Sequence, residues 1–186
     1  MSAAERHRTH AGHFTALVAG VADWSAPAPV AGWTALDVVR HLVERFPGFM
    51  AAGGHPLPPG PDVAADPVAA WAHQYDAVQA LLDDPDAGAQ AITNPHIGEV
   101  PLPEAVDRFY TADVFMHSWD LAVASGQDET LDPVFCQELL DGMTPIEDML
   151  RSSGQYGPRV DVSPTAPVHE RLMGFIGRDP AWSPTD

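Results

Sequence analysis

Apolar side chains recur at steps of three and four residues in five long segments of this sequence, and stretches rich in proline and glycine separate these segments. The steps match the 3.6-residue period of the α-helix, so each segment predicts a helix that buries one face. The predicted helices span residues 4–23, 34–46, 67–82, 103–125 and 133–152, with a short helical piece at 168–176. No alternation of Val, Ile and Thr is long enough to predict a sheet. The pattern therefore predicts an all-α protein.

Residues with known preferences mark the ends of several predicted helices. Thr34 begins the second helix, and Asp37 follows three residues later, as in a capping box. Pro47 lacks a backbone N–H and restricts the residue before it, so we expect the second helix to end there. Gly126 is predicted to stop the fourth helix, because glycine readily adopts the left-handed conformation that follows many helix ends.

The length of the chain predicts its domain organisation. A chain of 186 residues is long enough to bury a core without disulfides, so we expect one helical-bundle domain over residues 1–186. Residues 151–186 are predicted to form an irregular tail that packs on the bundle. The single cysteine, Cys136, lies in an apolar helical pattern and is predicted to be buried and inert.

Charge and composition exclude some classes of binding partner and indicate a cellular location. The chain carries 26 acidic and 9 basic side chains, for a net charge of −17. Such a surface repels phosphate backbones and anionic lipids, so we expect neither nucleic acid nor a membrane as a partner. We interpret the acidity as a source of solubility. One cysteine, a polar and charged N-terminal stretch, and no run of 18 apolar residues predict a cytoplasmic protein.

The segment 113–122, DVFMHSWDLA, contains two candidate metal ligands. Asp113 and His117 are four residues apart, so a helix would place both side chains on one side, one turn apart. The pair could supply two ligands of a metal site, and His41 in the second predicted helix could supply a third, as helical bundles bind metals between facing helices. Two alternatives stay open: the pair can be a side-chain hydrogen bond, and His41 a buried core histidine.

Further polar residues are candidates for supporting roles. Asp120 lies on a similar side of the helix and could orient His117 through its second ring nitrogen, or form an ion pair or a cap. Trp119 is predicted to pack in the core. His96 could act as a general acid or base, or lie on the surface. Arg178 could hold an anionic substrate group, or tie the tail to the domain.

Three histidines recur at every third position of the first predicted helix. The spacing places them along one side, and we interpret them as a solvated stripe without metal. They are His7, His10 and His13.

Three segments that cover both ends and the middle of the chain carry a resemblance to a known family. They read GWTALDVVRHLV, DRFYTADVFMHSWDLAVASGQDETLDP and RLMGFIGRDPAW. They resemble the DinB-like metal-binding superfamily, in its mycothiol-dependent maleylpyruvate isomerase-like branch. The resemblance implies a DinB-like four-helix bundle, here with an additional helix and an irregular C-terminal tail. It also implies that His41, Asp113 and His117 bind a divalent metal. Zinc is the default, and nickel, iron and manganese suit the same ligands.

The resemblance also implies a class of reaction. Two imidazoles and one carboxylate leave a coordination position open, and a divalent metal there would acidify a bound thiol or water. The implied function is a thiol-using transferase or isomerase, with mycothiol as the thiol and a small electrophile as the substrate. A non-catalytic protein that binds metal or a small ligand is the alternative, and a vestigial site is a third reading.

Two departures from the family limit this transfer. The characterised isomerases have glutamate where this chain has Asp113, and they carry an additional C-terminal domain. Their isomerase activity therefore does not transfer directly. Dimerisation is common among bundles of this kind, so a homodimer stays open.

Overall fold

The computed structural model describes residues 1–94 and 98–184, and it confirms the all-α prediction. The α-helices are α1 (Ala3–Gly20), α2 (Ala35–Ala52), α3 (Pro67–Asp83), α4 (Leu102–Val106), α5 (Ala112–Ser125), α6 (Pro133–Met143), α7 (Glu147–Ser152) and α8 (Val168–Ile176). Short 3₁₀ turns form η1 (Ala87–Ala89) and η3 (Thr144–Ile146), and a π-helical turn forms η2 (Asp107–Thr111). Two short antiparallel strands, β1 (Ala91–Asn94) and β2 (Gly98–Pro101), complete the described elements.

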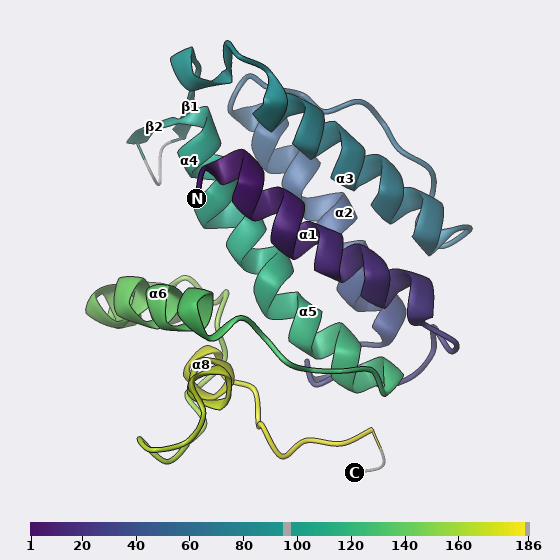
Figure 1. The fold of residues 1–186 in the computed structure, drawn as a ribbon, viewed down its shortest axis with the longest axis vertical. Coiled ribbons are helices and arrows are strands. Elements are labelled where there is room, and N and C mark those ends of the chain that lie inside the picture. The colour runs from purple at the N-terminus through teal and green to yellow at the C-terminus, as the bar shows by residue number, and fades with distance from the viewer. Residues whose placement is uncertain (95–97, 185–186) are drawn as a thin grey trace.

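Four helices form the main bundle. α1 packs against both α3 and α5, and α2 packs against the same two helices from the other side (Figure 1). Phe14 of α1 and Trp71 of α3 are fully buried between them, with ring centroids 4.5 Å apart in an edge-to-face arrangement. The indole nitrogen of Trp71 donates to the Thr15 hydroxyl at 2.8 Å, so the only polar atom of this large side chain is satisfied.

A second apolar cluster joins the C-terminal elements to α5. Phe115 and Trp119 of α5 pack with Cys136 of α6 and Leu172 of α8. Figure 1 shows α6 and α8 beside the bundle, on the α5 side. α5 is therefore buried on two sides, which leaves hardly any exposed position along it.

Pro47 does not end α2, so that part of the prediction was wrong. The helix continues to Ala52, and the capping box predicted for its start, between Thr34 and Asp37, is present. A proline inside a helix removes one backbone hydrogen bond. Phe46 and Met50, on either side of Pro47, are both buried, and their packing holds the helix together across the missing bond.

Other predicted helices are interrupted where the backbone changes its hydrogen-bond pattern. The predicted fourth helix is continuous in direction but contains the π-helical turn η2 between α4 and α5. The predicted fifth helix is broken by η3, which contains Pro145. Gly126 ends α5 with φ 66°, as predicted, and the predicted short helix is α8.

The predicted solvated histidine stripe on α1 was wrong. His7 and His10 are buried, and only His13 is exposed. The His7 ring stacks on Tyr75 of α3, and the His10 ring stacks on Phe135 of α6, so neighbouring elements cover the side of α1 on which both histidines lie. The Nδ1 atom of His7 bonds Gln79 Oε1 at 2.9 Å.

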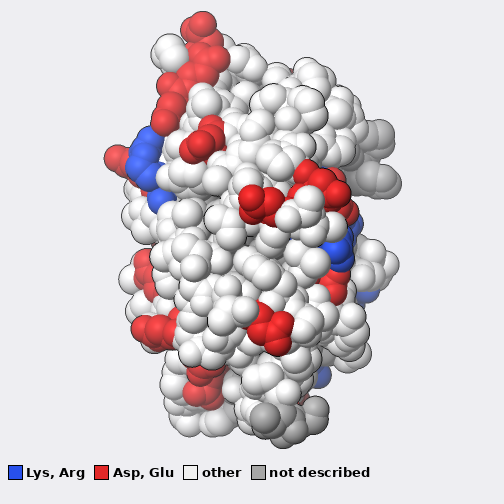
Figure 2. Space-filling model, turned by 90° about the vertical axis from the view of Figure 1, so that its right-hand side faces the viewer, with Lys and Arg blue, Asp and Glu red and all other residues white. Residues whose placement is uncertain are grey.

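Acidic side chains are spread over the surface. Figure 2 shows one face on which the acidic groups are scattered and the basic groups are few. None of the described helices combines the length and the apolar character needed to cross a bilayer.

Candidate metal centre

The three predicted ligands come from two helices that pack against each other, α2 and α5. The Thr34–Asp37 capping box fixes the start of α2, and His41 lies on the helix two turns further on. Asp113 lies in the first turn of α5, and His117 lies one turn later on the same side. Helix periodicity and the packing of α2 on α5 together bring the three side chains to one place.

The donor atoms of the three side chains converge. His41 Nε2 is 2.9 Å from Asp113 Oδ2, and His117 Nε2 is 3.5 Å from Asp113 Oδ1. One ligand atom from each residue lies within 4.8 Å of the others. Ligands about 2.0–2.2 Å from a tetrahedral ion are themselves about 3.4 Å apart, so the spacing suits a shared ion. The structure therefore brings together His41, Asp113 and His117 as a group that could hold a divalent metal.

Asp113 reaches both histidines although aspartate is one methylene shorter than glutamate. Its side chain is 34% exposed, whereas the imidazoles of His41 and His117 are 14% and 6% exposed. The imidazole of His117 is thus buried, that of His41 is partly buried, and the carboxylate is the most exposed member of the group. A ligand approaching from solvent would meet the group at Asp113.

Electrostatics keep the carboxylate of Asp113 ionised. Burial by itself would raise its pKa, but His117, His41 and Arg178 outweigh that effect and hold the pKa below the usual carboxyl value. An ionised carboxylate is the form that ligates a metal. Asp113 is therefore in its ligating form at neutral pH.

Asp120 makes the contact with His117 that the sequence suggested. His117 Nδ1–H donates to Asp120 Oδ2 at 2.7 Å, and this contact is buried. In the neutral imidazole the proton then lies on Nδ1, and the lone pair of Nε2 faces Asp113 and His41. Metal-bound histidines usually have such a partner on the second nitrogen, which fixes the tautomer and the ring orientation.

Arg178 binds the same carboxylate from the C-terminal segment. Its Nε donates to Asp120 Oδ1 at 3.2 Å, and its Nη2 donates to Oδ2 at 3.0 Å. Burial would raise the pKa of Asp120, but Arg178 and His117 hold it below the usual carboxyl value. Both alternatives for Asp120, a partner of His117 and an ion pair with an arginine, are therefore realised at once. Arg178 ties the tail to α5.

Trp33 is a neighbour of the centre that the sequence analysis did not select. Its ring stacks on that of His117, with centroids 5.7 Å apart and planes 17° apart, and lies 5.1 Å from the His41 ring. The loop holds it through Trp33 N–H donating to the Val30 carbonyl at 2.9 Å. The sequence did offer a signal for Trp33: it directly precedes the capping box of α2, so it had to lie near the start of the helix that carries His41.

The structure places two further residues that the sequence analysis singled out, Trp119 and Cys136. His96 falls outside the described residues. Trp119 is 2% exposed and packs in the second core, as predicted. Cys136 is buried as predicted, and burial raises the pKa of its thiol to about 12, so the reactive thiolate is disfavoured.

Comparison with known proteins gives a family but no activity. No protein-family model and no solved structure matches the chain. "Uncharacterized protein Rv0738" of Mycobacterium tuberculosis strain H37Rv is 33% identical over 176 residues, which cover 89% of this chain and 91% of that protein. "Uncharacterized protein MT0763" of strain CDC 1551 matches to the same extent. The chain belongs to the family of these two proteins. The Rv0738 similarity leaves out only about a tenth of the chain, so it spans both α2 and α5.

Proposed function

We propose that this protein binds a divalent metal ion, with zinc as the default, through His41, Asp113 and His117. The observation that supports the proposal most strongly is the convergence of three ligand atoms from α2 and α5 within 4.8 Å. The buried hydrogen bond from His117 to Asp120 also supports the proposal. Metal-bound histidines usually have such a partner on the second ring nitrogen, whereas a chance cluster of polar groups does not require one. An uncharged-imidazole and carboxylate set of this kind is typical of zinc sites that keep a position open.

We further propose that the metal serves a thiol-using transferase or isomerase of the DinB-like class, acting on a small electrophile. A bound divalent ion would supply Lewis acidity that lowers the pKa of a thiol. Asp113 would face the incoming thiol, because its carboxylate is the exposed side of the group. Trp33 would form an apolar wall over the imidazoles and keep water from that side. Mycothiol as the thiol rests on the sequence resemblance alone.

The residues leave the proton of the thiol a route to solvent. Asp120 is engaged by both His117 and Arg178, so it is not free to accept a proton. Asp113 is ionised and one-third exposed, and its hydrogen bond, at 2.9 Å, is to His41. Its solvent-facing side is therefore where we expect a displaced proton to leave.

The metal-binding part is tested by elemental analysis. Purified protein loaded with zinc and passed through a desalting column should retain about one equivalent. His41→Ala and His117→Ala should retain little, whereas His13→Ala, which changes an exposed histidine, should behave as wild type. Wild-type protein that retains no metal after loading would refute the proposal.

The catalytic part needs a separate assay. Zinc-loaded protein is mixed with mycothiol and a panel of small electrophiles, and the loss of free thiol is followed against His41→Ala as control. Faster thiol loss in the wild type supports the transferase or isomerase. A protein that binds zinc but leaves the thiol loss unchanged across the panel would instead be the non-catalytic binding protein.

A further inference from the structure

Arg178 was predicted either to hold an anionic substrate group or to tie the tail to the domain, and its bonds leave it little capacity for a ligand. Its Nε and Nη2 atoms donate to Asp120, and its Nη1 atom donates to the Ile176 carbonyl at 3.3 Å. Releasing Arg178 from the fully buried Asp120 would leave a buried charge without its partner, which is costly. Another side chain of the C-terminal region is therefore the better candidate to hold a ligand at the metal centre.

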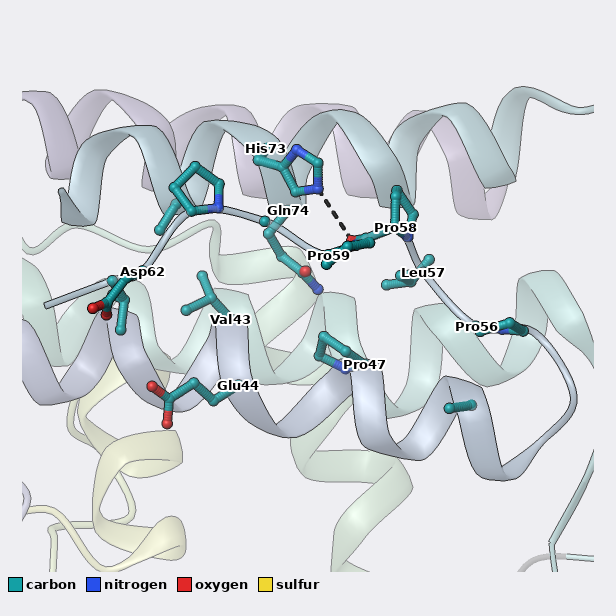
Figure 3. Close-up of a pocket in the computed structure, with 15 residues that line it drawn as sticks. Val43, Glu44, Pro47, Pro56, Leu57, Pro58, Pro59, Asp62, His73 and Gln74 are labelled. Carbon is teal, nitrogen blue, oxygen red and sulfur yellow. Dashed lines mark hydrogen bonds between the residues drawn. The ribbon is translucent and has the colours of Figure 1, made fainter. Parts of the chain in front are cut away.

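The cavity between α2, α3 and the proline-rich segment 56–61 is separate from that centre. It measures about 460 Å³, and Figure 3 shows Val43 and Gln74 among the side chains around it. The described residues that line it include none of the three candidate ligands. A ligand of the metal centre would instead meet the exposed carboxylate of Asp113.

The segment between α7 and α8 is bound to the end of α8. Arg151 donates to the carbonyls of Gly157, in that segment, and of Phe175, in α8. The Val160 N–H donates to the Gly174 carbonyl at 2.9 Å. Separate contacts thus hold this segment against the last turn of α8.

The closest approach within this contact places Tyr156 beside Arg178. Gly177 has a φ of 89°, and a Cβ added to it would lie 2.9 Å from the Cα atom of Gly157. Tyr156 directly precedes Gly157, and Arg178 directly follows Gly177. The contact therefore brings Tyr156 next to the arginine that bonds Asp120.

The phenol of Tyr156 is a hydrogen-bond donor near Asp113. Burial, and then the negative charge of Asp113, raise the pKa of Tyr156 to about 12, so the hydroxyl keeps its proton at neutral pH. The ring packs against the second apolar cluster, yet the side chain is only partly buried. Among residues 1–94 and 98–184, none forms a hydrogen bond with this hydroxyl. The donor is therefore available to a ligand.

Tyr110 is a second phenol that the charge of Asp113 reaches, but its donor is already used. Its side chain is 1% exposed, and its hydroxyl forms a hydrogen bond with the side chain of Gln74. A ligand that enters from solvent would not reach it. Tyr156 is thus the phenol that such a ligand can meet.

We propose that the Tyr156 hydroxyl donates a hydrogen bond to an oxygen atom of the small thiol that binds at the candidate metal centre. This inference rests on the proposed function, because the metal and the thiol come from there. The bond is assigned to an oxygen because oxygen is a stronger acceptor than sulfur. A thiol with an oxygen acceptor near its sulfur is accordingly preferred over a plain alkyl thiol. Tyr156 holds the ligand, and Arg178 positions Asp120.

The test uses the full chain loaded with Co²⁺ and two thiols that differ by a hydroxyl group, 2-mercaptoethanol and ethanethiol. A thiolate sulfur bound to Co²⁺ produces a strong near-ultraviolet absorption band, so titration gives a Kd for each thiol without any turnover. The measured quantity is the Kd of 2-mercaptoethanol divided by the Kd of ethanethiol. Tyr156→Phe should raise this ratio about three- to tenfold, the loss expected for one hydrogen bond.

Tyr75→Phe is the matched control. Tyr75 is partly buried like Tyr156, but it lies on α3 and its ring stacks on that of His7. Removal of the Tyr75 hydroxyl should leave the ratio unchanged. Both thiols are measured on the same preparation, so partial unfolding of a variant lowers both bands and leaves the ratio intact.

The outcomes separate this inference from the proposed function. An unchanged ratio in Tyr156→Phe, or an equal change in Tyr75→Phe, overturns the role of Tyr156 and leaves metal binding standing. Wild-type protein that retains no Co²⁺ refutes the metal site itself. Wild-type protein that retains Co²⁺ but shows no thiolate band refutes the use of a thiol and this inference with it.

Discussion

Replacing Asp120 by asparagine tests whether the residue behind His117 prepares the imidazole for a metal. Asp120 is fully buried, and it accepts hydrogen bonds from His117 and Arg178. Asp120→Asn keeps an acceptor oxygen but removes the negative charge. Partners of this kind typically contribute about 10–100-fold to metal affinity. Because the acceptor remains, we expect a loss near the lower limit, about tenfold, or about 1.4 kcal/mol of binding free energy.

The same change also destabilises the protein through Arg178. Removing one partner of a buried ion pair costs about 3–5 kcal/mol. Arg178 is 13% exposed, so it keeps some contact with water, and we expect a cost of at most about 3 kcal/mol in the free energy of unfolding. Combining Asp120→Asn with Arg178→Gln should restore part of the stability, because no buried charge then lacks its partner. The combination should leave the metal affinity low.

Zinc affinity is measured by competition with a chromophoric chelator, and stability by urea unfolding of the metal-free protein. The control is Asp148→Asn, which changes an exposed carboxylate and should alter neither quantity. A variant that loses stability but binds zinc as tightly as the wild type would show that Asp120 only anchors Arg178. That result would refute the positioning argument.

Further predictions concern pH, backbone conformation and the core. Burial lowers the pKa of His10, so protonation favours the unfolded chain. The unfolding free energy of metal-free protein should therefore fall as pH drops through about 6.5. Burial also lowers the pKa of His7, so His10→Phe should reduce that slope in urea titrations without abolishing it. Gly126→Ala should cost about 1 kcal/mol, because φ is 66° there and no atom crowds the site, whereas Gly12→Ala inside α1 should stabilise by about 0.5–1 kcal/mol. Thermal unfolding would contradict this reasoning if both alanines shifted Tm in the same direction. Phe14→Ala should lose about 3–5 kcal/mol, since the side chain is fully buried, and a loss under about 1 kcal/mol would contradict the proposed packing.

The sequence predicted the helices well where local signals and burial agree. The Thr34–Asp37 box and Gly126 are local devices, and both act at the helix ends where the pattern placed them. Pro47 locally predicted the end of α2, but the helix continues. The burial of Phe46 and Met50 outweighs the loss of one backbone hydrogen bond. That burial depends on contacts between distant segments, such as the stacking of Phe46 on Tyr110 of η2 at 4.0 Å, which no local pattern shows.

The sequence predicted the candidate metal ligands but not all of the residues that surround them. Asp113 and His117 share a helix, so their spacing fixes their relative position, whereas the approach of His41 depends on how α2 packs on α5. Trp33 lies in a loop, whose conformation has no periodic signal. His7 and His10 were misassigned because the sequence does not show that α1 is covered on several sides.

The reach of Arg178 across 58 residues to Asp120 has a consequence for where the chain can be cut. A fragment ending at Ile176 would retain α8 and all three candidate donors, yet Asp120 would lose its cationic partner. Proteolytic cleavage near Gly177 would therefore remove the Arg178 contact to Asp120, and through Asp120 it would disturb His117 of the candidate metal centre. If the proposed metal site is correct, the smallest fragment that binds metal as the whole protein would includes the residues up to Arg178.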